Sequence, residues 1–73
     1  MPYDYSKLRG RIVEVCGTQE EFSRRIGISP RSLSLKMTGK RPFKQQEIAA
    51  AVLVLNLNRN DIPLYFFGLK VQD

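Results

Sequence analysis

The sequence has 73 residues, of which 42% are hydrophobic and 26% charged, and its formal net charge is +5. These values exclude a second domain and a disordered chain, so we expect residues 1–73 to fold as one domain. No apolar run approaches the roughly 18 residues of a membrane span, and the N-terminus lacks the apolar segment of a signal peptide. We therefore expect a cytoplasmic protein that does not interact with membranes.

Few residues in the chain could perform catalysis or bind a metal. There is no histidine, and Cys16 has no second cysteine with which to form a disulfide or a metal site. The seven acidic residues are scattered, and no phosphate-binding loop or nucleophile motif is present. We expect no enzymatic activity, cofactor, metal or small-molecule substrate, and we interpret Cys16 as a small core residue.

Positive charge is concentrated in one segment. No acidic residue lies between Glu21 and Glu47, whereas seven basic residues do: Arg24, Arg25, Arg31, Lys36, Lys40, Arg41 and Lys44. The rest of the chain has five basic and seven acidic residues. A single basic patch would attract a polyanion such as nucleic acid, although a charged run is also typical of an ordinary solvated surface.

Two helices are predicted in the first part of the chain. Apolar residues at helical spacing indicate an amphipathic helix that ends at Gly17, and they are Tyr5, Leu8, Ile12, Val15 and Cys16. Gly10 weakens this helix by about 1 kcal/mol relative to alanine. Thr18 and Glu21 form a capping-box pattern, in which each side chain bonds the backbone amide of the other. A second helix therefore begins at Thr18, and Gly27 ends it.

A third helix follows after a very short connection. Ser29 and Pro30 are typical of an N-cap and a first helical position, and the helix is expected to reach about Met37 or Thr38. Only three residues, 27–29, join it to the second helix. The segment of about 18–38 is therefore predicted to be a helix-turn-helix.

The remaining chain predicts two more helices. Gly39 ends the third helix, and Phe43 in the next loop is expected to fold back onto the core. A fourth helix over about 45–55 is apolar nearly all round, which indicates burial in the middle of the domain. Asn58 or Asn60 caps a short fifth helix that Gly68 closes; Pro63 favours Asn60, because proline is tolerated only in a first turn.

The fifth helix is unusually rich in large apolar side chains. Four of them are candidates for a protein interface: Leu64, Tyr65, Phe66 and Phe67. The alternative is that these residues simply close the end of the helical bundle.

The third helix has an inward and an outward face. Leu33 and Met37 share the inward face, because residues three or four apart lie on the same side of a helix. The outward face can read DNA bases or contact a partner, and its candidate residues are Pro30, Arg31, Ser34 and Leu35. Candidate phosphate contacts lie at the helix ends and beyond: Thr18, Gln19, Thr38, Lys40, Arg41 and Lys44. An apolar centre with a basic edge is also typical of a protein–protein interface.

Residues 18–42 resemble the helix-turn-helix of the phage repressor and Cro family. The matching marks are Gln19, Ser23, Gly27, Leu33 and Gly39–Lys40. Beyond the motif, the segments YDYSKLRGRIVE, SLSLKMTGK and NDIPLYFFGLKVQ resemble the Cro-like modulator-of-repression proteins, or antirepressors, of Gram-positive temperate phages. Lys36 departs from the family, which usually has an apolar core residue there, and we expect its stem to lie along the core with the amine at the edge.

This resemblance implies an all-α, five-helix domain of the lambda repressor and Cro type. It implies a transcriptional regulator of the lytic–lysogenic switch in a bacterial host, with double-stranded operator DNA, the cognate phage repressor or both as targets. The alternative is a pure antirepressor that masks the repressor's DNA-binding surface without binding DNA. A homodimer is expected if the protein reads a palindrome. An enzyme or a toxin–antitoxin component on the same fold is a third class, because fold alone does not decide function.

Overall fold

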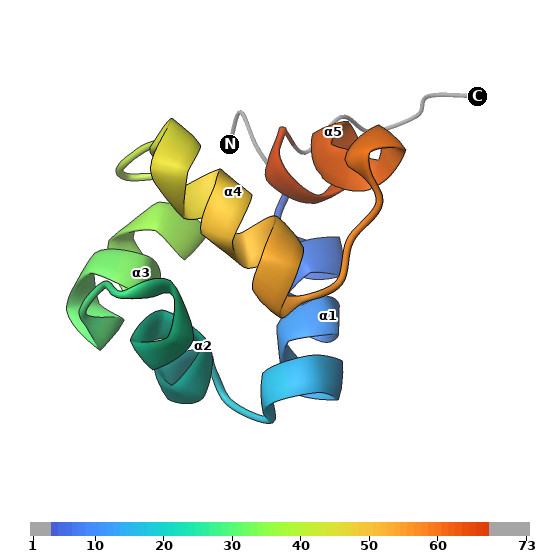
Figure 1. Ribbon diagram of the computed structural model, residues 1–73. Helices are drawn as coiled ribbons and strands as arrows, with labels where there is room; N and C mark the ends of the chain where they lie inside the picture. Colours follow the sequence, from blue (N-terminus) through green and yellow to red (C-terminus); the bar gives the residue numbers. More distant parts are fainter. Residues whose placement is uncertain (1–3, 68–73) are drawn as a thin grey trace.

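Five α-helices and one short 3₁₀ helix follow one another in the computed structural model, which describes residues 4–67. Their bounds are α1 Ser6–Cys16, α2 Gln19–Ile26, α3 Pro30–Met37, α4 Gln45–Val54, η1 Arg59–Asp61 and α5 Ile62–Phe66. Figure 1 shows α4 crossing the middle of the bundle, with α2 and α3 on one side and α1 and α5 on the other. The predicted all-helical, five-helix class is confirmed. Within residues 4–67, no helix has the length and apolar composition needed to cross a membrane.

The predicted caps begin α2 and α3. The Thr18 hydroxyl accepts from the Glu21 amide at 3.1 Å, and the Ser29 hydroxyl accepts from the Ser32 amide at 3.1 Å. The second half of the predicted capping box is wrong, because the Glu21 carboxylate turns to Arg24 and Arg25 instead of the Thr18 amide. Two charge-assisted partners compete successfully with one neutral amide.

Glycines end α2 and α3 as predicted. Gly27 and Gly39 both have φ of +80°, the left-handed conformation that glycine adopts without a Cβ penalty. The amide of Ile28 then bonds the carbonyl of Ser23 at 3.0 Å, and the amide of Lys40 bonds that of Leu35 at 2.9 Å. The Ile28–Ser23 bond closes the three-residue connection between α2 and α3, and the Lys40–Leu35 bond closes the end of α3.

The core contains side chains from all five α-helices. Its buried hydrophobic members are Tyr5, Leu8, Ile12, Phe22, Leu33, Met37, Ala51, Leu55 and Phe66. Leu33 and Met37 confirm the predicted inward face of α3. Phe43 confirms the expected return of its loop, because its ring meets those of Tyr5 and Phe66 edge to face. Core contacts therefore fix the position of α3, through Leu33 and Met37, and of the loop between α3 and α4, through Phe43.

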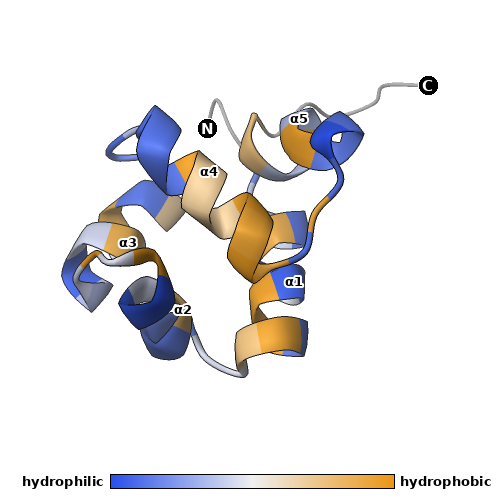
Figure 2. Cartoon of the chain, in the orientation of Figure 1, coloured by the Kyte–Doolittle hydropathy of each residue, from blue (hydrophilic) through white to orange (hydrophobic). Residues whose placement is uncertain are grey.

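The expectation that α4 is buried in the middle of the domain holds for one face of the helix only. Ala51 is its only buried residue, and Leu53 is 82% exposed. Figure 2 shows hydrophobic residues in the C-terminal half of α4 on the side that no other helix covers in this view. A bundle of this size has no second layer beyond α4, so only one of its faces can be buried.

The start of α5 also differs from the prediction. The N-cap position of α5 is occupied by Asp61, and not by Asn60 as predicted. Asn58 occupies the N-cap position of η1 instead, and neither Asp61 nor Asn58 makes a side-chain cap hydrogen bond. Pro63 lies in the first turn of α5, as expected. The predicted end at Gly68 lies outside the described residues.

Candidate functional site

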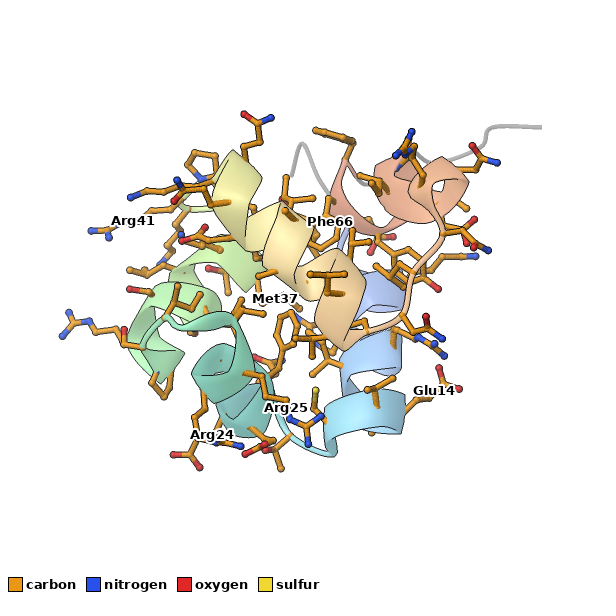
Figure 3. All side chains as sticks on the ribbon, in the orientation of Figure 1. Glu14, Arg24, Arg25, Met37, Arg41 and Phe66 are labelled. Carbon is orange, nitrogen blue, oxygen red and sulfur yellow. The ribbon has the colours of Figure 1, made fainter. Side chains whose placement is uncertain are left out.

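The outward face of α3 is free of the core. Arg31, Ser34 and Thr38 are exposed, and Leu35 is half-buried without being packed against the core cluster. The opposite face is anchored, and Figure 3 shows Met37 directed from α3 into the bundle. Pro30, in the first turn, is exposed as well. The four residues predicted to touch a base or a partner therefore lie together on one accessible helix face.

The backbone of Leu35 is the point where α3 joins the following loop. Its carbonyl accepts from the amide of Lys40 at 2.9 Å, from the amide of Arg41 at 3.3 Å and from the hydroxyl of Thr38 at 3.1 Å. The loop cations are therefore held next to the end of α3. Figure 3 shows Arg41 extending away from the bundle beside this helix.

Three of the seven predicted patch cations form ion pairs, with two carboxylates between them. The Glu21 carboxylate accepts from the guanidinium groups of Arg24, at 2.5 Å, and of Arg25, at 2.7 Å. These hydrogen bonds lower the pKa of Glu21 from 4.5 to about 2 and raise the pKa values of both arginines. Lys36 is the third, because it forms an ion pair with Glu47.

Four exposed cations remain near α3. Arg31, Lys40, Arg41 and Lys44 form no ion pair within residues 4–67. One lies in the first turn of α3, and three lie in the segment that connects α3 to α4. The basic patch therefore has fewer unpaired cations than the sequence suggested, with Arg31 at the start of α3 and the other three beyond its C-terminal end.

Lys36 is more deeply buried than predicted. Its amine was expected at the edge of the domain, but the side chain is only 6% exposed and donates to the Glu47 carboxylate, which is 11% exposed. The same carboxylate oxygen accepts from the Lys44 amide at 2.8 Å. Burial alone would raise the pKa of Glu47, but the bonds from Lys36 and Lys44 outweigh it and leave the pKa below 4.5.

Two shallow grooves flank α3. One, of about 370 Å³, is bordered by Ser29 and Ser32 at the start of α3 and by Arg41 and Lys44 of the loop. The other, of about 460 Å³, lies between α2 and the start of α3, with Glu20 and Arg24 on its rim. Ser29 and Ser32 were not among the predicted contact residues, although their spacing at the start of a helix indicates two hydroxyls on one side of it.

The predicted phosphate contacts differ in what they can donate. The Thr18 hydroxyl accepts from a backbone amide, so its own proton remains available. The Thr38 hydroxyl already donates to the carbonyls of Ser34, at 3.0 Å, and Leu35, at 3.1 Å. Thr38 would have to break these bonds to donate to a phosphate, and Gln19 is only half-exposed. Lys40, Arg41 and Lys44 are the better-placed members of that set.

The predicted apolar interface in α5 is largely used by the core. Phe66 is 3% exposed, so it cannot belong to a contact surface, and Tyr65 packs against the core. Leu64 is half-buried, and Phe67 is 46% exposed. In Figure 1, α5 lies across α4 from α3, so the residues that remain accessible do not extend the α3 surface.

The chain is similar to a protein family and to a solved structure. Residues 1–68 match the model of a family described as "Protein of unknown function (DUF739)". No curated protein matches the chain. One similar solved structure is that of the modulator of repression (MOR) of the temperate bacteriophage TP901-1 from Lactococcus lactis. It shares 53% sequence identity with a TM-score of 0.80, and the match covers 99% of this chain and 97% of that chain. This match confirms the resemblance that the sequence indicated.

Proposed function

This chain belongs to the family described as protein of unknown function (DUF739), and from its likeness to a phage modulator of repression we propose that it regulates the lytic–lysogenic switch of a temperate phage. It acts by binding and not by catalysis. Its target is engaged by the outward face of α3, with operator DNA as the first candidate target. The same surface supports a second candidate, the cognate phage repressor.

One observation carries the proposal: one face of α3 packs in the core, and its opposite face is exposed to solvent. Leu33 and Met37 hold one face in the core, whereas Arg31 on the other face is exposed and unpaired within the described chain. A helix presented in this way can enter the major groove of DNA, which is about 12 Å wide. Arg31 would there pair with guanine O6 and N7, and Ser34 would reach either type of base.

The unpaired loop cations support DNA as the target. Lys40, Arg41 and Lys44 would contact phosphates next to the groove that α3 enters, and these contacts position the helix without reading sequence. The Thr18 hydroxyl would add a neutral contact at the start of α2. If the operator is palindromic, two copies would bind its half-sites about one helical turn apart.

Salt dependence tests this first candidate. Duplex DNA from the phage's own switch region would be titrated with the protein by fluorescence anisotropy at several salt concentrations between about 50 and 200 mM. Three phosphate contacts predict that the affinity falls roughly 40-fold over this range. An affinity that does not change with salt would contradict a DNA function, because phosphate contacts release counterions when they form.

The apolar centre of the α3 surface favours the second candidate. Pro30 is exposed and Leu35 is half-buried without core contacts, and both lie among polar and basic neighbours. This composition suits a protein interface with a polar rim. In this mode the protein is a pure antirepressor, which covers the repressor's DNA-binding surface and does not itself bind DNA.

Complex formation with the cognate repressor tests the second candidate. The two proteins would be mixed at micromolar concentration and analysed by size-exclusion chromatography, with a co-eluting complex as the expected result. Leu35→Asp should abolish the complex. Leu53→Asp is the matched control, because it introduces the same charge at an exposed leucine on α4. Equal behaviour of the two variants would place the interface elsewhere.

A further inference from the structure

A buried ion pair joins α3 to the first turn of α4. The Lys36 amine donates to Glu47 Oε1, and that oxygen also accepts from the Lys44 amide at 2.8 Å. Within the described residues, no buried side-chain nitrogen or oxygen lacks a partner. The Glu47 carboxylate therefore accepts hydrogen bonds both from the Lys36 amine on α3 and from the backbone amide of Lys44 at the start of α4.

The Lys36–Glu47 pair also connects the two ends of loop 40–44, which contains the unpaired cations Lys40, Arg41 and Lys44. On the α3 side, the carbonyl of Lys36 accepts from the Gly39 amide at 3.1 Å, and that of Leu35 accepts from the Lys40 amide at 2.9 Å. On the α4 side, the Lys44 amide is bound by Glu47. Loop 40–44 is thus fastened at both ends to residues that the Lys36–Glu47 pair connects.

Stability alone does not explain a charged pair at this place. Replacing a buried ion pair by well-packed apolar residues is often neutral or stabilising, because desolvating two charges is costly. Leu33 and Met37 already attach α3 to the core with apolar contacts, which have no directional preference. A buried hydrogen-bonded ion pair adds direction, because the Lys36 amine reaches Glu47 only over a limited range of rotations and axial positions of α3.

We propose that Lys36 and Glu47 are positioning residues, whose buried ion pair sets the register of α3 and of loop 40–44 against α4. The affinity of the α3 surface for its target depends on this register, and this part of the inference rests on the proposed function. The side chains of Lys36 and Glu47 are only 6% and 11% exposed, although both line the groove that Ser29, Ser32, Arg41 and Lys44 border, so their role in this proposal is to hold that surface and not to contact the target.

The double variant Lys36→Met/Glu47→Gln tests the proposal. The Glu47→Gln change keeps an oxygen acceptor for the Lys44 amide, and Lys36→Met keeps the length of the lysine stem. The double variant therefore removes both charges and preserves the side-chain volume. It would be measured by thermal unfolding, by two-dimensional amide NMR of the free protein, and by binding to operator DNA and repressor.

The control is Arg11→Met/Glu14→Gln, which likewise replaces a basic residue by methionine and a glutamate by glutamine at a more exposed pair on α1, whose charged atoms are 3.7 Å apart. Arg11 also donates to the Leu55 carbonyl at 3.0 Å, so the control removes a bond to the end of α4 as well. That bond lies at the opposite end of α4 from the Lys36–Glu47 pair. The control therefore separates a general loosening of α4 from a change in the register of α3.

We expect the Lys36→Met/Glu47→Gln variant to unfold cooperatively within a few degrees of the parent chain. Amide shifts should change along 31–38 and 40–44, beyond the mutated residues, and target affinity should fall at least tenfold. The control should leave the α3 shifts and the affinity unchanged. Shifts confined to residues adjoining positions 36 and 47, with parental affinity, would overturn the proposal.

A conservative variant covers the case in which the double variant does not fold. Glu47→Asp keeps the charge and shortens the side chain by one methylene, so the pair can form only if α3 moves. We expect smaller shifts along the same segments and a several-fold loss of affinity; parental shifts would overturn the proposal. A parent chain that binds neither DNA nor repressor would refute the proposed function instead, while the amide shifts of the free protein still decide whether the pair sets the register.

Discussion

The ring of Phe43, in the loop between α3 and α4, meets the ring of Phe66 in α5 edge to face, with centroids 5.2 Å apart. On its other side Phe43 meets Tyr5 in the same way at 5.5 Å. Arg41 and Lys44 are close to Phe43 in the chain and belong to the unpaired cations of the α3 surface. A loop residue thus connects the proposed binding surface to both ends of the described chain.

Phe43→Ala should therefore destabilise the fold although it lies in a loop. Truncating a fully buried phenylalanine costs about 3–5 kcal/mol, and Phe43 is only half-buried, so we expect a loss of about 2 kcal/mol. In a domain of this size, that loss lowers the unfolding temperature by roughly 8–16 °C. Circular dichroism measures it, with Phe67→Ala, at a 46% exposed ring, as the control. Equal losses would mean that the edge-to-face contacts contribute nothing.

Local signals in the sequence predicted most of the fold. Thr18, Ser29, Gly27 and Gly39 act through their own backbone neighbours, so the limits of α2 and α3 could be identified before any tertiary contact was known. The side-chain partner of Glu21 could not be identified from the sequence, because two nearby arginines compete with the Thr18 amide for the same carboxylate. A helix cap involves residues close together in the chain and can be predicted from the sequence, whereas the choice of Glu21 between two kinds of donor depends on the positions of the side chains in space.

Long-range effects explain the other differences. Lys36 could not be matched with Glu47 from the sequence, because the two are eleven positions apart and meet only when α3 packs against the start of α4. The all-round apolar composition of α4 predicted a central helix, but nothing in the sequence says that one side of α4 lacks a neighbour. For the candidate site, helical spacing predicted the outward residues of α3, and the pairing of individual cations had to come from the structure.

Arg31→Ala should weaken DNA binding without affecting the fold. The side chain is exposed and has no ion pair among the described residues, so the unfolding temperature should not change. Loss of a bidentate guanine contact costs about 1–3 kcal/mol, which is roughly 5- to 150-fold in affinity. Arg59→Ala, at another exposed arginine, is the control for net charge. If both variants lose affinity equally, Arg31 contributes charge and does not read a base.

Two glycines should respond to alanine in opposite directions. Gly10 lies inside α1, and an added Cβ would meet no atom within 4 Å, so Gly10→Ala should stabilise the protein by about 0.5–1 kcal/mol. Gly27 has equally open surroundings but a φ of +80°, so Gly27→Ala should cost about 1–2 kcal/mol. Urea denaturation measures both. A stabilising Gly27→Ala would show that the turn between α2 and α3 does not need the left-handed conformation.

Stability should fall in acid through two carboxyl groups. The pKa of Glu21 is about 2 in the folded protein, and that of Glu47 lies below 4.5. A carboxyl group with a lowered folded-state pKa contributes stability above its unfolded-state pKa of about 4.3 and loses that contribution as the pH falls toward the folded value. The urea midpoint should therefore be level from pH 7 to about 5 and decrease toward pH 2. Glu21→Gln should reduce this decrease, whereas Glu20→Gln, at an exposed carboxylate with no ion pair to any residue in 4–67, should not.

Two leucines near the end of α4 test how this helix is buried. Leu55 is fully buried, and Leu55→Ala should cost about 3 kcal/mol because it leaves a cavity between α4 and the core. Leu53 is 82% exposed, and Leu53→Gln, which keeps helix propensity similar, should change stability by less than about 0.5 kcal/mol. Both variants would be compared with the parent by urea denaturation at two protein concentrations tenfold apart. A larger loss for Leu53→Gln that appears only at the higher concentration would mean that a second copy of the chain covers this face of α4.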